Sequence, residues 1–107
     1  MKEDLLKIIN HYGLSKQLKY IHSEYFELDE AIIDENNDEC VSVYEEVSEY
    51  HQNHIAEEIA DIMVMLKQFQ YLYEITDKRV ENIMKEKIKR QLERIEMENG
   101  VMDKKSR

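Results

Sequence analysis

Apolar side chains recur every three or four residues over 55–73, and this spacing constrains the fold more than any other feature of the sequence. The series consists of Ile55, Ile59, Ile62, Leu66, Phe69 and Tyr73. Such a period places the apolar residues on one face of an α-helix, whereas a half-buried strand would require strict alternation. The chain has no proline and only two glycines, so few residues interrupt a helix. We therefore expect an all-α fold.

Two earlier segments follow the same rule. Residues 2–11 are expected to form a short helix that Gly13 terminates, and Ser15 is expected to cap a second helix over about 15–35. The apolar seam expected on this second helix comprises Leu18, Ile21, Tyr25, Leu28 and Ile32. The polar residues 34–38 then indicate a loop.

The remaining segments are less regular. Residues 39–50 suit a helix or a strand, and the absence of a partner strand elsewhere favours a helix. Thr76 is expected to cap a last helix that ends near Asn99, with Gly100 beyond it. The sequence thus predicts one all-α domain over 1–100, a four- to five-helix bundle, followed by a frayed tail at 101–107.

The helix over 55–73 is apolar on a second side as well. The residues on that side are Ala56, Ala60, Met63 and Val64. A helix that is apolar nearly all round is buried on all sides. A chain of 107 residues cannot easily surround one of its own helices, so we expect a homo-oligomer formed through the central helices.

Charge and cysteine content exclude several classes of function. The net charge is −9, and residues 20–66 hold fourteen acidic residues without one Lys or Arg. This balance argues against binding to nucleic acid or to an anionic membrane. The single cysteine, Cys40, excludes an internal disulfide and a cysteine-built zinc site and suits a reducing cytoplasm. No apolar run reaches membrane-span length, and the N-terminus, with Glu3 and Asp4 and no long apolar stretch, is unlike a signal peptide.

Two pairs of acidic residues carry the candidate chemistry. Glu24 and Glu27 lie on the second expected helix, and Glu58 and Asp61 lie on the third. Residues three apart are neighbours on one helix face, so each pair places two carboxylates side by side. If the apolar seams of the two helices pack antiparallel, all four carboxylates border one groove. Carboxylates this close must take up protons or share a cation.

Oxygen ligands without a nearby cysteine favour Mg²⁺, with Mn²⁺ as a possible substitute. Mg²⁺ held by carboxylates keeps positions for water and for nucleotide phosphates, and a carboxylate can orient or deprotonate the attacking water. On the last helix Lys87, Arg90 and Arg94 form a basic stripe that can hold phosphates. The candidates for contact with a nucleobase are Tyr12, Lys16 and His22.

The two acidic motifs and their surroundings resemble the MazG-like, all-α nucleoside triphosphate pyrophosphohydrolases, whose hallmark is ExxE on one helix and ExxD on the next. The resemblance rests on SEYFELDEAI at 23–32 and HIAEEIADIMVMLKQF at 54–69, with support from HYGLSKQLKYI and from KEKIKRQLERI at 85–95. It covers roughly 11–98 and is greatest to short, single-domain members of phage or Firmicute type. The 30 residues between Glu27 and Glu58 make a long gap for the family, which an acidic insert at 34–53 explains.

The resemblance implies a fold, a reaction and roles. Glu24, Glu27, Glu58 and Asp61 would ligate Mg²⁺, with Glu24 or Glu27 also orienting the catalytic water. Lys87 and Arg90 would contact phosphates. The reaction would convert a (d)NTP to (d)NMP and pyrophosphate, for house-cleaning or control of nucleotide pools. The protein would be a homodimer or a tetramer.

Other chemistries fit less well. A di-iron bundle requires Glu-x-x-His motifs, and none of the four histidines has a Glu three residues before it. His51 and His54 form an HxxH without a second ligand cluster and are expected to be surface or loop residues. The main alternative is a non-catalytic acidic adaptor or decoy that occupies a basic surface of a partner protein. In that case the four carboxylates would be replaceable.

Overall fold

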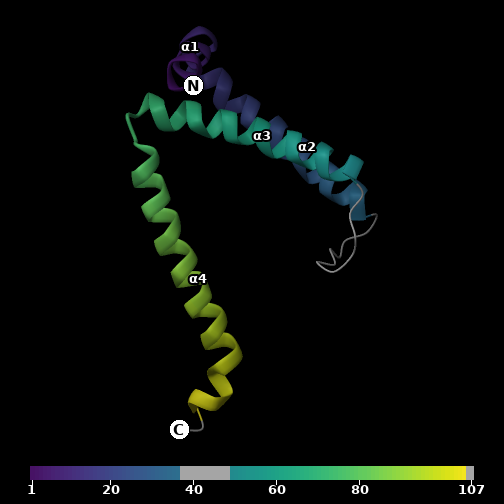
Figure 1. The fold of residues 1–107 in the computed structure, drawn as a ribbon, viewed down its shortest axis with the longest axis vertical. Coiled ribbons are helices and arrows are strands. Elements are labelled where there is room, and N and C mark those ends of the chain that lie inside the picture. Colours follow the sequence, from purple (N-terminus) through teal and green to yellow (C-terminus); the bar gives the residue numbers. More distant parts are fainter. Residues whose placement is uncertain (37–48, 106–107) are drawn as a thin grey trace. The chain divides into compact units, whose positions relative to one another are not determined.

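The computed structural model describes the backbone of residues 1–36 and 49–105 and the side chains of 1–33 and 49–100. These ranges hold four α-helices and no strand, which confirms the all-α prediction (Figure 1). The helices are α1 (Lys2–Tyr12), α2 (Leu14–Asn36), α3 (Glu49–Leu72) and α4 (Asp77–Lys105). They belong to two compact units, Met1–Glu74 and Ile75–Arg107. No helix in the described ranges has the length and apolar character needed to cross a membrane.

A single glycine joins α1 to α2. Gly13 has a φ of 90°, and its N–H donates a hydrogen bond of 2.8 Å to the Ile9 carbonyl, so it terminates α1 as the sequence predicts. The Gly13 carbonyl in turn accepts a 3.1 Å hydrogen bond from the Gln17 N–H of α2. Since α2 begins at Leu14, Ser15 lies inside its first turn, and the prediction that Ser15 caps the helix is wrong. Because only one residue connects the two helices, Gly13 occupies the N-cap position of α2.

The first unit is built on an antiparallel pair, α2 and α3, against which α1 packs (Figure 1). A hydrogen bond joins Gln17, near the start of α2, to Gln68, near the end of α3, which fixes the antiparallel direction. The buried apolar side chains described here are Leu5, Ile9, Ala31 and Met65. The buried polar ones are Gln17, Glu24 and Gln68. The centre of the helix pair is therefore mixed in polarity.

The buried face of α2 agrees only in part with the predicted seam, of which Ile21, Leu28 and Ile32 are half-buried. Leu18 and Tyr25 are exposed. The buried positions are Gln17, Glu24 and Ala31, which directly precede the predicted seam residues Leu18, Tyr25 and Ile32. An apolar pattern assigns Gln and Glu to the solvent side, but Gln17 is satisfied by a hydrogen bond across the helix pair. A polar side chain with such a partner tolerates burial, and α2 is rotated accordingly.

The face of α3 is also only partly as predicted. Ile55, Ile62 and Phe69 are half-buried, which agrees with the predicted seam. The alternate members of the series, Ile59, Leu66 and Tyr73, are exposed. Buried positions on α3 are instead Met65 and Gln68. The second apolar side of α3 is exposed in the single chain, as Met63 and Val64 show.

The segment between α2 and α3 falls partly outside the described residues. The predicted loop at 34–38 is wrong for 34–36, because α2 continues through Asn36. The last two residues of the predicted loop lie outside the described residues. The same is true of the predicted helix over 39–48 and of Cys40. Residues 49–50 form the start of α3, as the helical interpretation predicts.

The start of α4 agrees with the prediction and its end does not. The Arg79 N–H donates a 3.1 Å hydrogen bond to Thr76 Oγ1, so Thr76 caps the helix. The helix then continues through Gly100 to Lys105, and the predicted end near Asn99 is wrong. A glycine that ends a helix usually has a positive φ, and Gly100 does not. Glycine inside a helix costs only about 1 kcal/mol relative to alanine, which its neighbours can offset.

Candidate metal centre

The helix pair α2–α3 brings the two acidic motifs to the same level. Glu24 lies seven residues after Gln17 on α2, and Asp61 lies seven residues before Gln68 on α3. Gln17 and Gln68 contact each other, and the two helices are antiparallel. Two turns forward along α2 and two turns back along α3 therefore bring Glu24 opposite Asp61. Glu27 and Glu58 follow one turn further along. The register of the antiparallel pair thus matches the spacing of the two motifs.

The four carboxylates converge as the sequence predicts. Glu24, Glu27, Glu58 and Asp61 each offer one carboxylate oxygen, and these four atoms all lie within 4.8 Å of one another. This is the one group of three or more metal-ligating side chains found among the described residues. Four negative charges at such separations are strongly unfavourable unless protons or a cation balance them.

Burial divides the cluster into an inner and an outer part. Glu24 is 5% exposed and Glu58 is half-buried, whereas Glu27 and Asp61 are exposed. The Oε2 atoms of Glu24 and Glu58 are buried and have no hydrogen-bond partner among the described residues. A buried carboxylate oxygen without a partner costs about 1–3 kcal/mol or more. Two such atoms in one cluster can be satisfied by a shared cation or by a proton.

Electrostatics within the cluster act most strongly on Glu24. Burial raises the pKa of the Glu24 carboxyl above its ordinary value, and the nearby charges of Glu27 and Asp61 raise it further. A hydrogen bond from the Tyr20 hydroxyl opposes this by favouring the ionised form. The same hydrogen bond to Glu24 is the largest cause of a raised pKa at Tyr20. The hydrogen bond thus favours the protonated tyrosine and the ionised Glu24.

The donor set fits a hard divalent cation. All four ligands are carboxylate oxygens, without nitrogen or sulfur. Mg²⁺ prefers oxygen ligands and retains several waters, so it suits a cluster with one buried, one half-buried and two exposed carboxylates. Mn²⁺ accepts the same donors. Glu27 and Asp61 lie on the exposed side of the cluster.

Tyr20 was not identified from the sequence, although it lies one helical turn before Glu24. Its hydroxyl fixes the orientation of the Glu24 carboxylate, as outer hydrogen bonds to metal ligands commonly do. Tyr20→Phe is expected to weaken Mg²⁺ binding by about 10-fold, measured by isothermal titration calorimetry. Tyr25→Phe, at an exposed position on the same helix, is the control and should bind Mg²⁺ like the wild type. Equal affinities of all three proteins would contradict this role.

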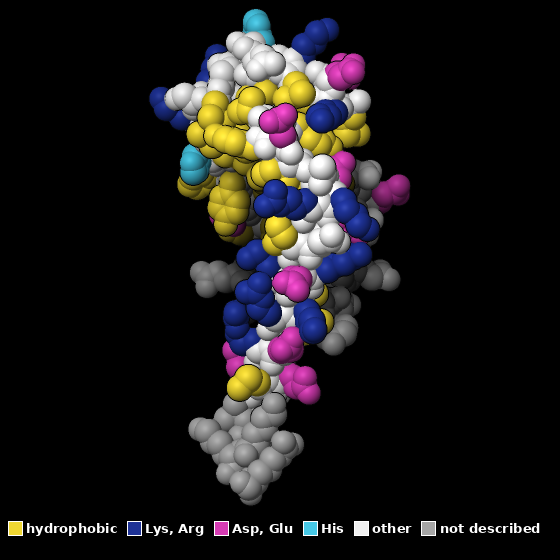
Figure 2. Space-filling model, turned by 90° about the vertical axis from the view of Figure 1, so that its left-hand side faces the viewer, with side chains coloured by type: hydrophobic (Ala, Val, Ile, Leu, Met, Phe, Trp, Pro, Cys, Tyr) yellow, Lys and Arg dark blue, Asp and Glu magenta, His cyan; other side chains and the backbone are white. Residues whose placement is uncertain are grey.

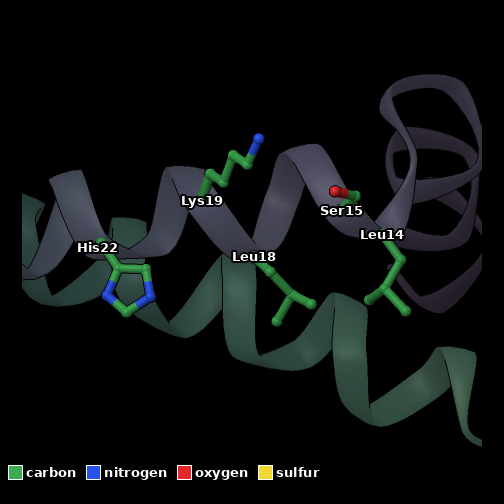
Figure 3. Close-up of a pocket in the computed structure, with 5 residues that line it drawn as sticks. All are labelled: Leu14, Ser15, Leu18, Lys19 and His22. Atoms are coloured by element: carbon green, nitrogen blue, oxygen red, sulfur yellow. The ribbon is translucent and has the colours of Figure 1, made fainter.

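The predicted base-contacting residues do not lie together. Tyr12 and Lys16 line one groove, and the Lys16 ammonium lies 5.2 Å from the centre of the Tyr12 ring. His22 lines a different surface hollow, together with Leu14, Ser15, Leu18 and Lys19 (Figure 3). Figure 3 shows Leu14, Leu18 and His22 projecting from the same side of α2. His22 therefore lines a different hollow from Tyr12 and Lys16, and contact of these residues with a nucleobase stays a prediction.

The predicted phosphate contacts lie in the second unit. Lys87 and Arg90 line a hollow of about 120 Å³ on α4, together with Gln91 and Arg94. Figure 2 shows Lys and Arg side chains along this helix. The basic stripe is thus present on one helix face, and its contact with phosphates stays a prediction.

The two histidines of the HxxH motif lie in the first turns of α3. His54 is exposed, and its ring stacks on Tyr50 with the ring centres 6.5 Å apart. His51 is half-buried and contacts the edge of the same tyrosine. Neither belongs to the metal-ligating group found among the described residues. Both histidines thus have ordinary ring contacts on the helix surface.

Comparison of the chain with models of known protein families, with curated proteins and with solved structures found no match. The resemblance to the MazG-like enzymes therefore stays a prediction, and functional inference depends on the geometry of the carboxylate cluster.

Proposed function

We propose that the protein is a Mg²⁺-dependent nucleoside triphosphate pyrophosphohydrolase, which converts a (d)NTP to (d)NMP and pyrophosphate. The observation that supports this most is the carboxylate cluster. Four oxygens from two helices lie within 4.8 Å of one another, and two of the carboxylates carry buried oxygens without a described partner. Burial of a carboxylate oxygen without a partner is costly, and a solvated acidic surface gives no reason for it. A bound cation would offset that cost.

The proposed roles follow from burial. Glu24 and Glu58 hold the cation from the inner side, and Glu27 and Asp61 complete its ligands at the exposed side. When bound, Mg²⁺ neutralises charge on the phosphate oxygens. Glu27 accepts a hydrogen bond from a water and takes its proton as the water oxygen bonds to the α-phosphorus. The bond from that phosphorus to the bridging oxygen breaks, and its electron pair leaves with pyrophosphate.

Charge makes the proposed reaction depend fully on metal. Residues 20–66 carry fourteen acidic residues and no Lys or Arg, so a polyphosphate approaches the cluster only after a cation has bound. The same charge disfavours nucleic acid as a partner. A cytoplasmic location and a role in cleansing or controlling nucleotide pools belong to the proposal as well, and the single cysteine is compatible with that location.

The experiment that tests the proposal is product release from a panel of canonical and non-canonical nucleoside triphosphates, with Mg²⁺ and with EDTA. We expect monophosphate and pyrophosphate in equal amounts, with activity lost in EDTA and restored by Mg²⁺ or Mn²⁺. Release of inorganic phosphate instead would indicate cleavage at another bond. Folded protein that binds no metal and releases no product would favour the non-catalytic acidic adaptor.

The proposal includes a homo-oligomer. Leu18 and Tyr25 lie seven residues apart on one side of α2, and Ile59 and Leu66 lie seven apart on one side of α3; all four are exposed. Glu27 lies about 200° around the axis of α2 from Tyr25, so this apolar face is on the flank away from the exposed carboxylates. Exposed apolar surface of this extent is typical of interfaces.

Leu66→Glu is expected to weaken self-association by at least about 10-fold, because it places a charge at the centre of the exposed apolar face. The measurement is molar mass by light scattering over a series of protein concentrations. Asn53→Glu adds the same charge at an exposed polar position of α3 and should leave the mass unchanged. A monomeric wild type at all concentrations would contradict the prediction.

A further inference from the structure

A groove between α1, α2 and α3 lies beside the candidate metal centre. It has a volume of about 400 Å³ and lies wholly within the first unit. Tyr12 forms part of it from α1, Tyr20 from α2 and Met65 from α3. Tyr20 also hydrogen-bonds Glu24, so this one side chain belongs both to the groove and to the carboxylate cluster. A ligand in the groove therefore lies next to the metal-binding carboxylates.

Two buried carboxamides contribute to the groove lining. Gln17 is 6% exposed and Gln68 is 1% exposed, and the Gln17 Nε2 donates a 2.8 Å hydrogen bond to the Gln68 Oε1. The Met65 sulfur is a weak acceptor, 3.8 Å from Gln68 Nε2 and 3.9 Å from Gln17 Nε2. These contacts use both N–H donors of Gln17 and one N–H of Gln68. The Gln17 oxygen, the second Gln68 N–H and one lone pair of the Gln68 oxygen remain for a further ligand.

The spacing between the amides and the carboxylates suits a nucleotide. Gln17 and Glu24 are seven residues apart on α2, as are Asp61 and Gln68 on α3. At 1.5 Å rise per residue, the two levels are about 10 Å apart on both helices. A sugar and its base extend over a similar distance from the α-phosphate. A nucleotide with its phosphates at the carboxylates therefore reaches the amides with its base.

We propose that this groove binds the nucleobase and sugar of the triphosphate, and that Gln17 and Gln68 read the edge of the base. This assignment rests on the proposed function. Adjacent donor and acceptor atoms on a base edge match the acceptor that Gln17 retains and the donor that Gln68 retains. The rings of Tyr12 and Tyr20 provide aromatic walls that suit a flat base.

Direct binding tests the assignment without requiring turnover. The probes are a nucleoside triphosphate and inorganic tripolyphosphate, which has the phosphates but no base, each titrated with Mg²⁺ in a calorimeter. We expect the wild type to bind the nucleotide at least about 10-fold more tightly than tripolyphosphate. Wild-type protein that binds both probes equally would overturn the assignment.

The informative variant is the double substitution Gln17→Leu with Gln68→Leu. Replacing both partners of a buried hydrogen bond by apolar groups of similar shape is often neutral for stability, so this variant should fold. We expect its nucleotide affinity to fall by at least about 10-fold and its base preference to flatten, with the affinity for tripolyphosphate unchanged. Unchanged nucleotide affinity and base preference would show that the two amides are only structural.

Two further variants separate the explanations. Tyr12→Ala alters a half-exposed wall of the groove, so it should fold and weaken binding of the nucleotide but not of tripolyphosphate. Gln52→Leu makes the same Gln-to-Leu change at an exposed position of α3 and should bind both probes as the wild type does. A protein that selects nucleotide over tripolyphosphate through Gln17 and Gln68 but releases no pyrophosphate would support the groove and contradict the proposed reaction.

Discussion

Glu58→Gln is expected to lower the rate of pyrophosphate release by at least about 100-fold at saturating nucleotide. The substitution keeps the shape of the side chain and removes its negative charge. Glu58 Oε2 is buried within the carboxylate cluster and has no described hydrogen-bond partner, so a neutral amide there loses the interaction that this position can make with a cation. The measurement is the initial rate with the preferred nucleotide at several Mg²⁺ concentrations.

The matched control is Glu30→Gln. Glu30 is an exposed glutamate of α2 outside the cluster, and its replacement removes the same charge from the same acidic segment. Its rate should stay within about 2-fold of the wild type, since isolated surface charges contribute little. If both variants lose activity equally, general electrostatics rather than metal ligation would explain the effect. If neither loses activity, the cluster is not the metal centre of the reaction.

Glu24→Gln is expected to act on stability in two opposite ways. In EDTA near neutral pH, the free energy of unfolding should rise by about 1–3 kcal/mol, because the variant no longer buries a charge beside Glu27 and Asp61. In Mg²⁺ the order should reverse, because only the wild type gains the free energy of metal binding. Urea denaturation in EDTA and in Mg²⁺ measures both effects. Lower stability of the variant in EDTA would contradict the argument.

The raised pKa of Glu24 also sets the sign of a pH dependence. Above the ordinary carboxyl pKa, the folded metal-free protein binds a proton that the unfolded chain has released. The contribution of Glu24 to stability is therefore most favourable at low pH and declines as pH rises toward its raised pKa. Wild-type protein in EDTA should lose stability as the pH rises from the ordinary carboxyl pKa through the raised pKa of Glu24, and Glu24→Gln should flatten this slope. Identical slopes in the two proteins would contradict the assignment to Glu24.

The sequence predicted the carboxylate cluster because its geometry depends on two simple spacings. Residues three apart share a helix face, and an antiparallel pair with apolar faces brings two such motifs together. The helices themselves follow from the period of apolar residues and from the lack of proline. The end of α1 at Gly13 and the start of α4 at Thr76 were also predicted. Each depends on one residue and its immediate neighbours: the Thr76 hydroxyl caps α4, and Gly13 ends α1 with a positive φ.

The polar centre of the helix pair was not predictable in this way. Gln17 and Gln68 are 51 residues apart, and only their contact makes burial of either one favourable. An apolar pattern therefore placed Leu18 and Tyr25 inside and Glu24 at the edge, whereas the structure exposes the first two and buries the third. Tyr20 was not predicted because its hydrogen bond to Glu24 depends on that rotation of α2. The spacing of residues three or four apart does not reveal polar pairs between distant parts of the chain.

The one-residue connection at Gly13 joins one wall of the proposed base groove to the helix pair that carries the carboxylates. Tyr12, which forms a wall of the groove, directly precedes it, whereas every carboxylate of the cluster lies on α2 or α3. No described atom lies within 4 Å of the position that a Cβ on Gly13 would occupy, so a side chain there would act only through the backbone torsion. A single substitution at this residue can thus reset the angle of α1 and the size of ligand admitted. Specificity can diverge among descendants of this chain while the carboxylates stay in place.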